Sequence, residues 1–302
     1  MSHTTESIRN IALTGHGAAG KTTLVESILY HAGKLAAPGV VEKGNTVCDF
    51  DPQEKAHQHS LDAALVNFDY NGAHINLIDT PGFPDFIGQA IAVLPAVETM
   101  AVVINAQTGI EAITQRMMSR AANRGQCRMI IVNKIDAENV NLPELLSQIQ
   151  NAFGKECLPI NLPANNNTQV VDCFFNPAGE SDFSSVAATH SALIDQVVEV
   201  DEDLMALYLE QGEDLQPEQL HAPFEKALRE AHLIPICFVS ARTGVGVKEL
   251  LDIFVRLLPN PLEGNPEPFL KGEGGTVETL YAVPDPQRHV VAHVFKVVMD
   301  PF

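Results

Sequence analysis

The chain has 302 residues, of which 45% are hydrophobic and 19% are charged, and its formal net charge is -19. A chain of this length can bury a sizeable core and is too apolar for a disordered protein, and its acidity argues against simple electrostatic binding to nucleic acid. Its five cysteines form no C-x-x-C pair, which indicates neither a disulfide framework nor a zinc site. No apolar run reaches the roughly 18 residues of a membrane span, and the start of the chain lacks a signal-peptide core, so we expect a cytoplasmic protein that does not bind membranes.

Short apolar runs alternate with helical patterns along most of the chain. The runs that predict strands are Ile8 to Thr14, Ala63 to Tyr70, His74 to Asp79, Thr99 to Asn105, Arg128 to Asn133 and Pro235 to Val239. The patterns that predict helices are Lys21 to His31, Ile110 to Arg124, Leu142 to Phe153 and Val247 to Leu258. This alternation predicts an α/β fold, with a mostly parallel sheet that helices cover on both faces. Asn71-Gly72-Ala73 is a hairpin signal, so we expect one antiparallel edge strand.

Two stretches interrupt this alternation. Lys34 to Ser60 shows no clear periodicity, and a loop of that length inside a compact domain is usually functional or mobile. Residues 157–234 contain fourteen acidic and two basic side chains, a net charge of -12. Within them, Gln169 to Phe175 looks like a strand and Val186 to Leu209 like a helix. We expect this acidic stretch to be a separate unit with a basic partner.

The last part of the sequence begins with a turn-rich linker from Pro259 to Pro266. Thr276 to Val283 and His289 to Met299 then look like strands. Two strands alone do not make a stable domain, so we expect the chain to end inside a second, β-rich domain.

A phosphate-binding motif, G-x-x-x-x-G-K-[ST], follows the first predicted strand and opens the first predicted helix. Its residues are Gly15, His16, Gly17, Ala18, Ala19, Gly20, Lys21 and Thr22, followed by Thr23. Backbone N–H groups of such a turn converge on a β-phosphate, and a lysine in this position reaches the β- and γ-phosphates. The hydroxyl of Thr22 is the expected ligand of Mg²⁺. A glycine-rich turn without a ligand is the alternative interpretation.

Polar motifs also follow two further predicted strands. Asp79-Thr80-Pro81-Gly82 places an acid where it can hold Mg²⁺ through water and an N–H where it can face a γ-phosphate. Asn133-Lys134-Ile135-Asp136 offers a carboxylate that can accept from guanine N1–H and N2–H₂, whereas adenine has no matching donors. Each tetrapeptide alone could be a simple strand-end turn. Together, the three motifs predict a GTP or GDP site with Mg²⁺.

With these motifs, the sequence resembles the translational GTPases, and specifically elongation factor G and elongation-factor-G-like proteins. Ser240-Ala241 resembles the family's fifth base-binding element, the acidic stretch sits where elongation factor G carries its G′ subdomain, and Phe295 to Phe302 is similar to the opening of its β-barrel domain. The resemblance implies a GTP-binding domain over residues 1–156 and 235–263, a G′-like insertion over 157–234 and the start of a β-barrel over 264–302.

The resemblance also implies a monomer that hydrolyses GTP on the ribosome. Its acidic insertion would contact a basic ribosomal stalk protein, although a merely solvated charged face is the other interpretation. Domains outside this chain would contact nucleic acid. Residues Lys21, Ser60, Gly82 and Phe83 fall on the catalytic positions, and Thr22, Ser60 and Asp79 on the metal-binding ones.

The sequence departs from the family at several of these positions. Phe83 stands where the family has a histidine beside the attacking water, and phenylalanine has no hydrogen-bonding group. Ser60 replaces a metal-binding threonine but keeps its hydroxyl, while Ala18 replaces an aspartate. A nucleotide-binding switch with impaired hydrolysis is therefore one alternative, and a related GTPase of the release-factor or ribosomal-protection type is another. His57 and His59 lack a third ligand at suitable spacing, which favours a solvated loop over a metal site.

Overall fold

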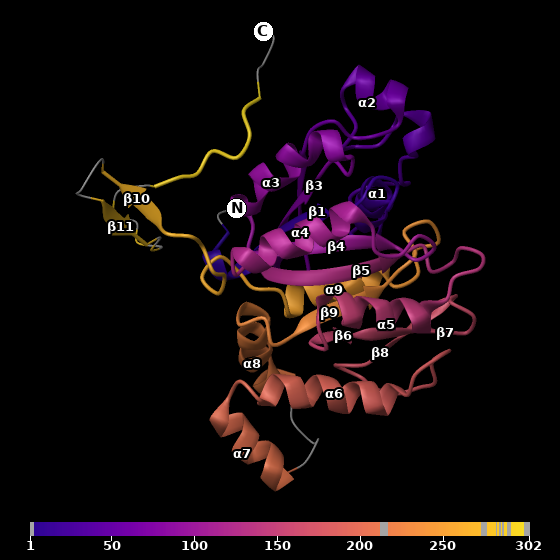
Figure 1. The fold of residues 1–302 in the computed structure, drawn as a ribbon, viewed down its shortest axis with the longest axis vertical. Coiled ribbons are helices and arrows are strands. Elements are labelled where there is room, and N and C mark those ends of the chain that lie inside the picture. Colours follow the sequence, from indigo (N-terminus) through magenta and orange to yellow (C-terminus); the bar gives the residue numbers. More distant parts are fainter. Residues whose placement is uncertain are drawn as a thin grey trace.

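A computed structural model describes residues 3–211, 217–272, 277–281, 283, 285, 287–288 and 291–298. Its central sheet has seven strands in the order β2-β3-β1-β4-β5-β9-β6 (Figure 1). They are β1 (Ile8–Thr14), β2 (Ala64–Tyr70), β3 (Ala73–Asp79), β4 (Thr99–Asn105), β5 (Cys127–Asn133), β6 (Cys157–Pro159) and β9 (Ile234–Phe238). All neighbouring pairs are parallel except β2 with β3. The expected α/β fold, with a mostly parallel sheet and one antiparallel edge strand, is confirmed.

Burial explains why the central strands read as continuous apolar runs. Every residue of β4 is buried, whereas the edge strand β2 alternates between buried and exposed side chains. Covered strands need apolar residues on both faces, and an edge strand with one wet face does not. The β2–β3 hairpin turns at Asn71 and Gly72, where φ is 45° and 85°. Positive φ at both central residues is the requirement of the tight hairpin turn that this pair favours.

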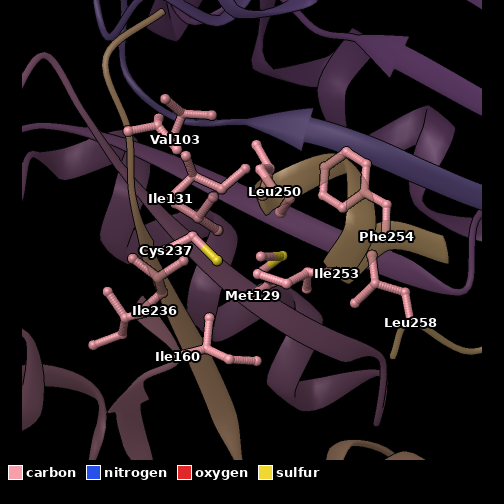
Figure 2. Packing of buried hydrophobic residues seen from close by; sticks show 14 of the residues in the cluster. Val103, Met129, Ile131, Ile160, Ile236, Cys237, Leu250, Ile253, Phe254 and Leu258 are labelled. Atoms are coloured by element: carbon pink, nitrogen blue, oxygen red, sulfur yellow. The ribbon is translucent and has the colours of Figure 1, made fainter. Parts of the chain in front are cut away.

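Helices cover both faces of the sheet. They are α1 (Lys21–His31), α3 (Ile87–Val93), α4 (Ala112–Asn123), α5 (Leu142–Phe153) and α9 (Val247–Arg256), with a short α2 (Pro52–His57) in the loop before β2. In Figure 1, α4 and α5 lie in front of the sheet and α9 lies behind it, where it contacts α1. Figure 2 shows Leu250 and Phe254 of α9 among strand side chains such as Met129 and Cys237. Spacings of three and four residues put the apolar residues of α9 on this one face.

The acidic stretch begins with a strand of the main sheet, because β6 pairs in parallel with β9. Beyond it, β7 (Asn161–Ala164) and β8 (Gln169–Asp172) form a separate antiparallel pair, followed by α6 (Val186–Val198), α7 (Glu202–Gln211) and α8 (Pro217–Arg229). These helices lie below the sheet in Figure 1.

Two expectations within this stretch need correction. The predicted strand to Phe175 ends at Asp172, because the carboxylate of Asp172 accepts from the backbone N–H groups of the next residues and turns the chain. The predicted single helix from Val186 is two helices. The carboxylate of Asp201 accepts from the N–H of Leu204 and so caps a new helix, α7.

The last described segment contains one short hairpin, β10 (Phe269–Lys271) paired with β11 (Glu278–Leu280). The expected strand from Thr276 to Val283 is thus shorter than predicted, and positions 276 and 282 lie outside the described residues. Residues 291–298 form no strand, and positions 289, 290 and 299 of that prediction are not described. Within the described parts of the chain, no helix is long and apolar enough to cross a membrane.

Candidate nucleotide-binding site

The glycine-rich motif forms the turn between β1 and α1. Three of its residues have positive φ, namely Gly15 at 132°, Ala18 at 61° and Gly20 at 87°. At Gly15 a Cβ would collide with the backbone of Val103 in β4, and at Gly20 with the side-chain amide of Asn133. Glycine is therefore required where this turn passes close to its neighbours. The turn ends directly in the N-terminus of α1, whose free N–H groups favour an anion.

Lys21 is the buried cation of this turn. Its side chain is 6% exposed, and Nζ donates to the carbonyl oxygens of Gly15 and His16, each at 3.0 Å. Burial lowers the pKa of Lys21 to about 8, against the opposing effect of the nearby acids Asp79 and Glu111. A buried ammonium that donates to backbone carbonyls is suited to a phosphate, which would supply the compensating negative charge.

Oxygen-bearing side chains gather beside Lys21. The Thr22 hydroxyl donates to Asp79 Oδ2 at 2.6 Å, and Ser60 Oγ lies 3.4 Å from Thr22 Oγ1. Ser60 in turn donates to Asp49 Oδ1 at 3.0 Å. The other carboxylate oxygen of Asp79 is buried without a hydrogen-bond partner, and burial raises the pKa of Asp79 to about 6. Two hydroxyls and an unpartnered buried carboxylate oxygen are hard donors of the kind that Mg²⁺ prefers, so the residues present fit that ion.

The segment after β3 lies against the phosphate-binding turn. The Thr80 hydroxyl donates to the carbonyl of Leu13 at 2.8 Å and so ties this segment to β1. A Cβ on Gly82 would overlap Lys21 Nζ and the backbone of Gly17, which makes glycine obligatory for this approach. The Phe83 ring, 38% exposed, lies over Gly17. Pro81, which completes this motif, is buried between Thr80 and Gly82.

Asn133 connects the glycine-rich turn to the element that contains Ser240 and Ala241. Its amide nitrogen donates to the carbonyl of Ala19 at 3.0 Å, and its amide oxygen accepts from the N–H of Ala241 at 3.0 Å. This is possible because β5 and β9 are parallel neighbours, so residues that follow them meet at the same edge of the sheet. The sequence-predicted elements at 133–136 and 240–241 are therefore brought together.

The remaining residues of these two elements also contact each other. Lys134, at φ 66°, donates from Nζ to the carbonyl of Ala18 at 2.8 Å. Asp136 Oδ1 accepts from the Ser240 hydroxyl at 2.5 Å, and Asp136 Oδ2 pairs with Arg242 at 2.6 Å. Arg242 follows Ser240-Ala241 directly, yet a motif search for those two residues does not single it out.

Two adjoining clefts follow this edge of the sheet. The larger, about 790 Å³, is bordered by Thr23 and by residues after β5 and β9, namely Asn133, Lys134, Asp136, Ala137, Glu138, Ala241 and Arg242. The smaller, about 240 Å³, is bordered by Lys21, Thr22, Thr23, Asp49, Gln58, His59, Ser60, Gly82 and Phe83. Five residues border both clefts, namely Gly20, Thr23, Val41, Glu42 and Lys134. The larger has room for a base and sugar, and the smaller lies at the buried ammonium.

The loop between α1 and β2 is held by a residue that sequence reasoning missed. Glu26 of α1 is 1% exposed, and its carboxylate accepts from the N–H groups of Gly39 at 2.6 Å and Val47 at 2.5 Å. The loop also contains α2, whose N-terminus has a full capping box at Asp51 and Glu54. That pattern was visible in the sequence, whereas the clamp by Glu26 depends on loop geometry.

Several histidines lie near acids or near one another. His57 and His59 stack at 5.9 Å between ring centroids, and no described acid or thiol completes a metal-binding cluster with them. Of the described residues, His3, Asp69 and His74 are close enough to share an ion, at the β2–β3 edge. Inside the site, His16 Nε2 lies 3.4 Å from Glu111 Oε1.

This fold and site define a class of protein. The family model of the elongation factor Tu GTP-binding domain matches residues 6–260, and the chain belongs to that family. Membership implies guanine-nucleotide binding for this domain, and the resemblance to translational GTPases predicted from the motifs is confirmed.

Particular relatives narrow the resemblance to elongation factor G and its like. The chain is 34% identical to an elongation factor G-like protein of Mycobacterium tuberculosis and 30% identical to elongation factor G of Dehalococcoides mccartyi. Each alignment covers 98% of this chain, and it covers 43% and 45% of those proteins. A crystal structure from Thermus thermophilus matches 88% of this chain and 42% of its own, with a TM-score of 0.78 and 31% identity. The chain thus spans less than half the length of these relatives. Their names favour elongation factor G and elongation-factor-G-like proteins over the release-factor and ribosomal-protection types.

Proposed function

We propose that this chain binds GTP with Mg²⁺ and hydrolyses it to GDP and phosphate, as the G domain of an elongation-factor-G-like protein that acts on the ribosome. The observation that carries the proposal is the bridging position of Asn133. Its amide joins the phosphate-binding turn at Ala19 to the base-side element at Ala241. One side chain therefore fixes the distance between the two halves of a nucleotide site.

The binding roles follow from the chemistry of each half. Lys21 and the N–H groups of the turn would contact the β- and γ-phosphates, and Gly82 would approach the γ-phosphate with its N–H. Asp136 would accept from the guanine N1–H and N2–H₂, while Asn133, Lys134, Ser240 and Ala241 hold the base edge and ring. Thr22, Ser60 and Asp79 would hold Mg²⁺, which supplies positive charge beside the phosphates.

The chemistry of hydrolysis depends mostly on positioning. Phosphoryl transfer needs its nucleophile and leaving group in line and its equatorial charge neutralised. In this chain the buried Lys21 and the α1 N-terminus provide fixed positive charge. Ser60 and Gly82 border the cleft where the attacking water must stand.

We further propose that residues 1–156 and 235–263 form the G domain, 157–234 the G′-like insertion and 264–302 the start of a β-barrel domain. The exposed acids Asp195 on α6, Glu199 directly after that helix, and Glu202 and Asp203 on α7 support a basic stalk protein as the partner of the insertion. The whole protein would be a cytoplasmic monomer, and nucleic acid would contact segments beyond these residues.

The test is nucleotide binding followed by turnover. The chain should bind GTP and GDP at least about a hundredfold more tightly than ATP in competition with a fluorescent guanine nucleotide, as a site built to hydrogen-bond one base rejects another. It should then release phosphate from γ-labelled GTP, and purified ribosomes should accelerate release by the full-length protein. Equal affinity for ATP and GTP, or absence of phosphate release with GTP bound, would contradict the proposal.

A further inference from the structure

His59 and Phe83 form a pair of rings at the smaller cleft. Their centroids are 4.7 Å apart with an interplanar angle of 53°. Both border the cleft together with Ser60, Gly82 and Lys21. His59 comes from the loop before β2 and Phe83 from the segment after β3, so two separate stretches of chain meet over the place expected for a γ-phosphate.

The two rings differ in what they can offer to water. Phe83 covers Gly17 and carries no hydrogen-bonding atom. His59 is half-buried and carries two ring nitrogens, of which Nδ1 lies 3.5 Å from the carbonyl of Ser60. Its Nε2 has no hydrogen-bond partner among the residues that the structure describes. At this ring pair, hydrogen bonding to water is therefore available only through His59.

We propose that His59 is the residue that hydrogen-bonds to and orients the attacking water. This inference rests on the proposed GTP hydrolysis. In that reaction the water oxygen bonds to the γ-phosphorus while the bond from phosphorus to the β–γ bridging oxygen breaks. GDP leaves with the bonding electron pair, and both protons of the water leave with the inorganic phosphate. His59 acts by alignment, and Phe83 holds its ring and excludes other water.

Two neighbours of His59 provide a competitor and a control. Gln58 is exposed, has φ 57° and also borders the cleft, so it is the other side chain of this turn that could reach a water. His57 is exposed and stacks on His59 without bordering the cleft. A His57→Phe variant therefore makes the same chemical change at a position away from the proposed water.

The experiment measures phosphate release by the chain in single turnover, together with affinity for a non-hydrolysable GTP analogue. His59→Phe keeps an aromatic ring against Phe83 but removes the nitrogens. We expect it to slow release at least about tenfold, less than the roughly 10²- to 10⁴-fold of a proton-transferring group because His59 acts by alignment alone, with affinity changed less than about threefold. His59→Gln should retain more activity than His59→Phe. His57→Phe should match the parent.

A second substitution that restores an imidazole tests whether the lost rate comes from the missing hydrogen bond to water or from altered packing of the two rings. Adding Phe83→His to His59→Phe exchanges the two rings and should restore most of the lost rate, because an imidazole again borders the cleft. Parent-like release by His59→Phe, or a loss confined to Gln58→Ala, overturns the role of His59 while leaving GTP hydrolysis intact. A parent that binds GTP but releases no phosphate overturns the proposed hydrolysis and this inference with it.

Discussion

Arg242 Nη2 lies 2.6 Å from Asp136 Oδ2, so the carboxylate proposed to read guanine is paired with a guanidinium. The Arg242 side chain is 78% exposed, although that of Asp136 is only 14% exposed, so the guanidinium is solvated by water and its attraction to the carboxylate is weakened. A guanine base can therefore replace this partner with little loss. The second oxygen of Asp136 stays held by Ser240, which keeps the carboxylate oriented.

Asp136→Asn should shift the preference of the chain from guanine toward xanthine nucleotides. In xanthine a carbonyl replaces the amino group of guanine. The side-chain amide of asparagine can donate to that carbonyl, whereas its N–H₂ group gives the guanine amino group no acceptor. Competition between GTP and XTP for the site is the measurement. Arg242→Ala is the matched control, for which GTP affinity should change by no more than about fivefold, as an exposed pair allows. Unchanged GTP and XTP affinities in Asp136→Asn would remove Asp136 from the base site.

Chelation of divalent cations should weaken GTP binding by at least about tenfold, which is about 1.4 kcal/mol. The reason is that Thr22, Ser60 and the unpartnered oxygen of Asp79 offer hard donors beside the phosphate cleft. Titration of a fluorescent GTP analogue with and without EDTA measures the difference. Thr22→Ala should reduce this EDTA-dependent difference in affinity. Ser147→Ala, which removes a hydroxyl on α5, should leave the difference unchanged. An affinity indifferent to EDTA would contradict the metal site.

Glu26→Gln should loosen the loop between α1 and β2. A carboxylate accepts both N–H groups of Gly39 and Val47, whereas an amide presents a donor to one of them, a mismatch worth about 1 to 3 kcal/mol. Tryptic cleavage at Lys43, inside the clamped loop, should accelerate at least about fivefold. Glu42→Gln is the control, since Glu42 is exposed in the same loop. If both variants are cut at the parent's rate, the clamp does not hold the loop.

Hydrogen exchange of the same loop should depend on the bound nucleotide. Ser60 is tied to Asp49 and lies near Thr22, so GTP with Mg²⁺ would recruit its hydroxyl and protect the amides of Lys34 to Ser60 more than GDP does. Exchange measured with GDP and with a non-hydrolysable GTP analogue makes the comparison. Equal protection in both states would show that the loop does not respond to the γ-phosphate.

The stability of the chain should carry a pH dependence that originates at Glu98. Burial raises the pKa of Glu98 to about 7, so between about pH 4.5 and 7 the folded state binds more protons than the unfolded state. Its contribution to the free energy of unfolding therefore falls as pH rises through that window. Glu98→Gln should be more stable than the parent at pH 8, by about 1 to 3 kcal/mol, and similar to it near pH 4.5. Denaturant unfolding at both pH values tests this, with exposed Glu6→Gln as control.

The sequence predicts the sheet and the position of the site well, because both follow from strong local patterns. Buried strands such as β4 are uninterrupted apolar runs, and each polar motif begins where such a strand ends. The break at Asp201 was also readable as a helix cap, but a continuing apolar pattern concealed it. The clamp by Glu26 and the pairing of Arg242 with Asp136 join positions far apart in the chain, and no local pattern encodes them.

The pairing of β6 with β9 means that residues 160–233 leave the sheet after Pro159, at the C-terminal end of β6, and return to it at Ile234, the first residue of the neighbouring strand. An excursion that leaves one strand and re-enters at the neighbouring parallel strand can vary in its outer helices without altering the order of β5 and β9, whose C-terminal ends position Asn133 and Ser240. Lineages could therefore remodel this excursion for new binding partners while the nucleotide pocket stays unchanged. For the same reason an exposed turn of this excursion offers an insertion point where a fluorescent reporter domain could be grafted onto the nucleotide-binding domain.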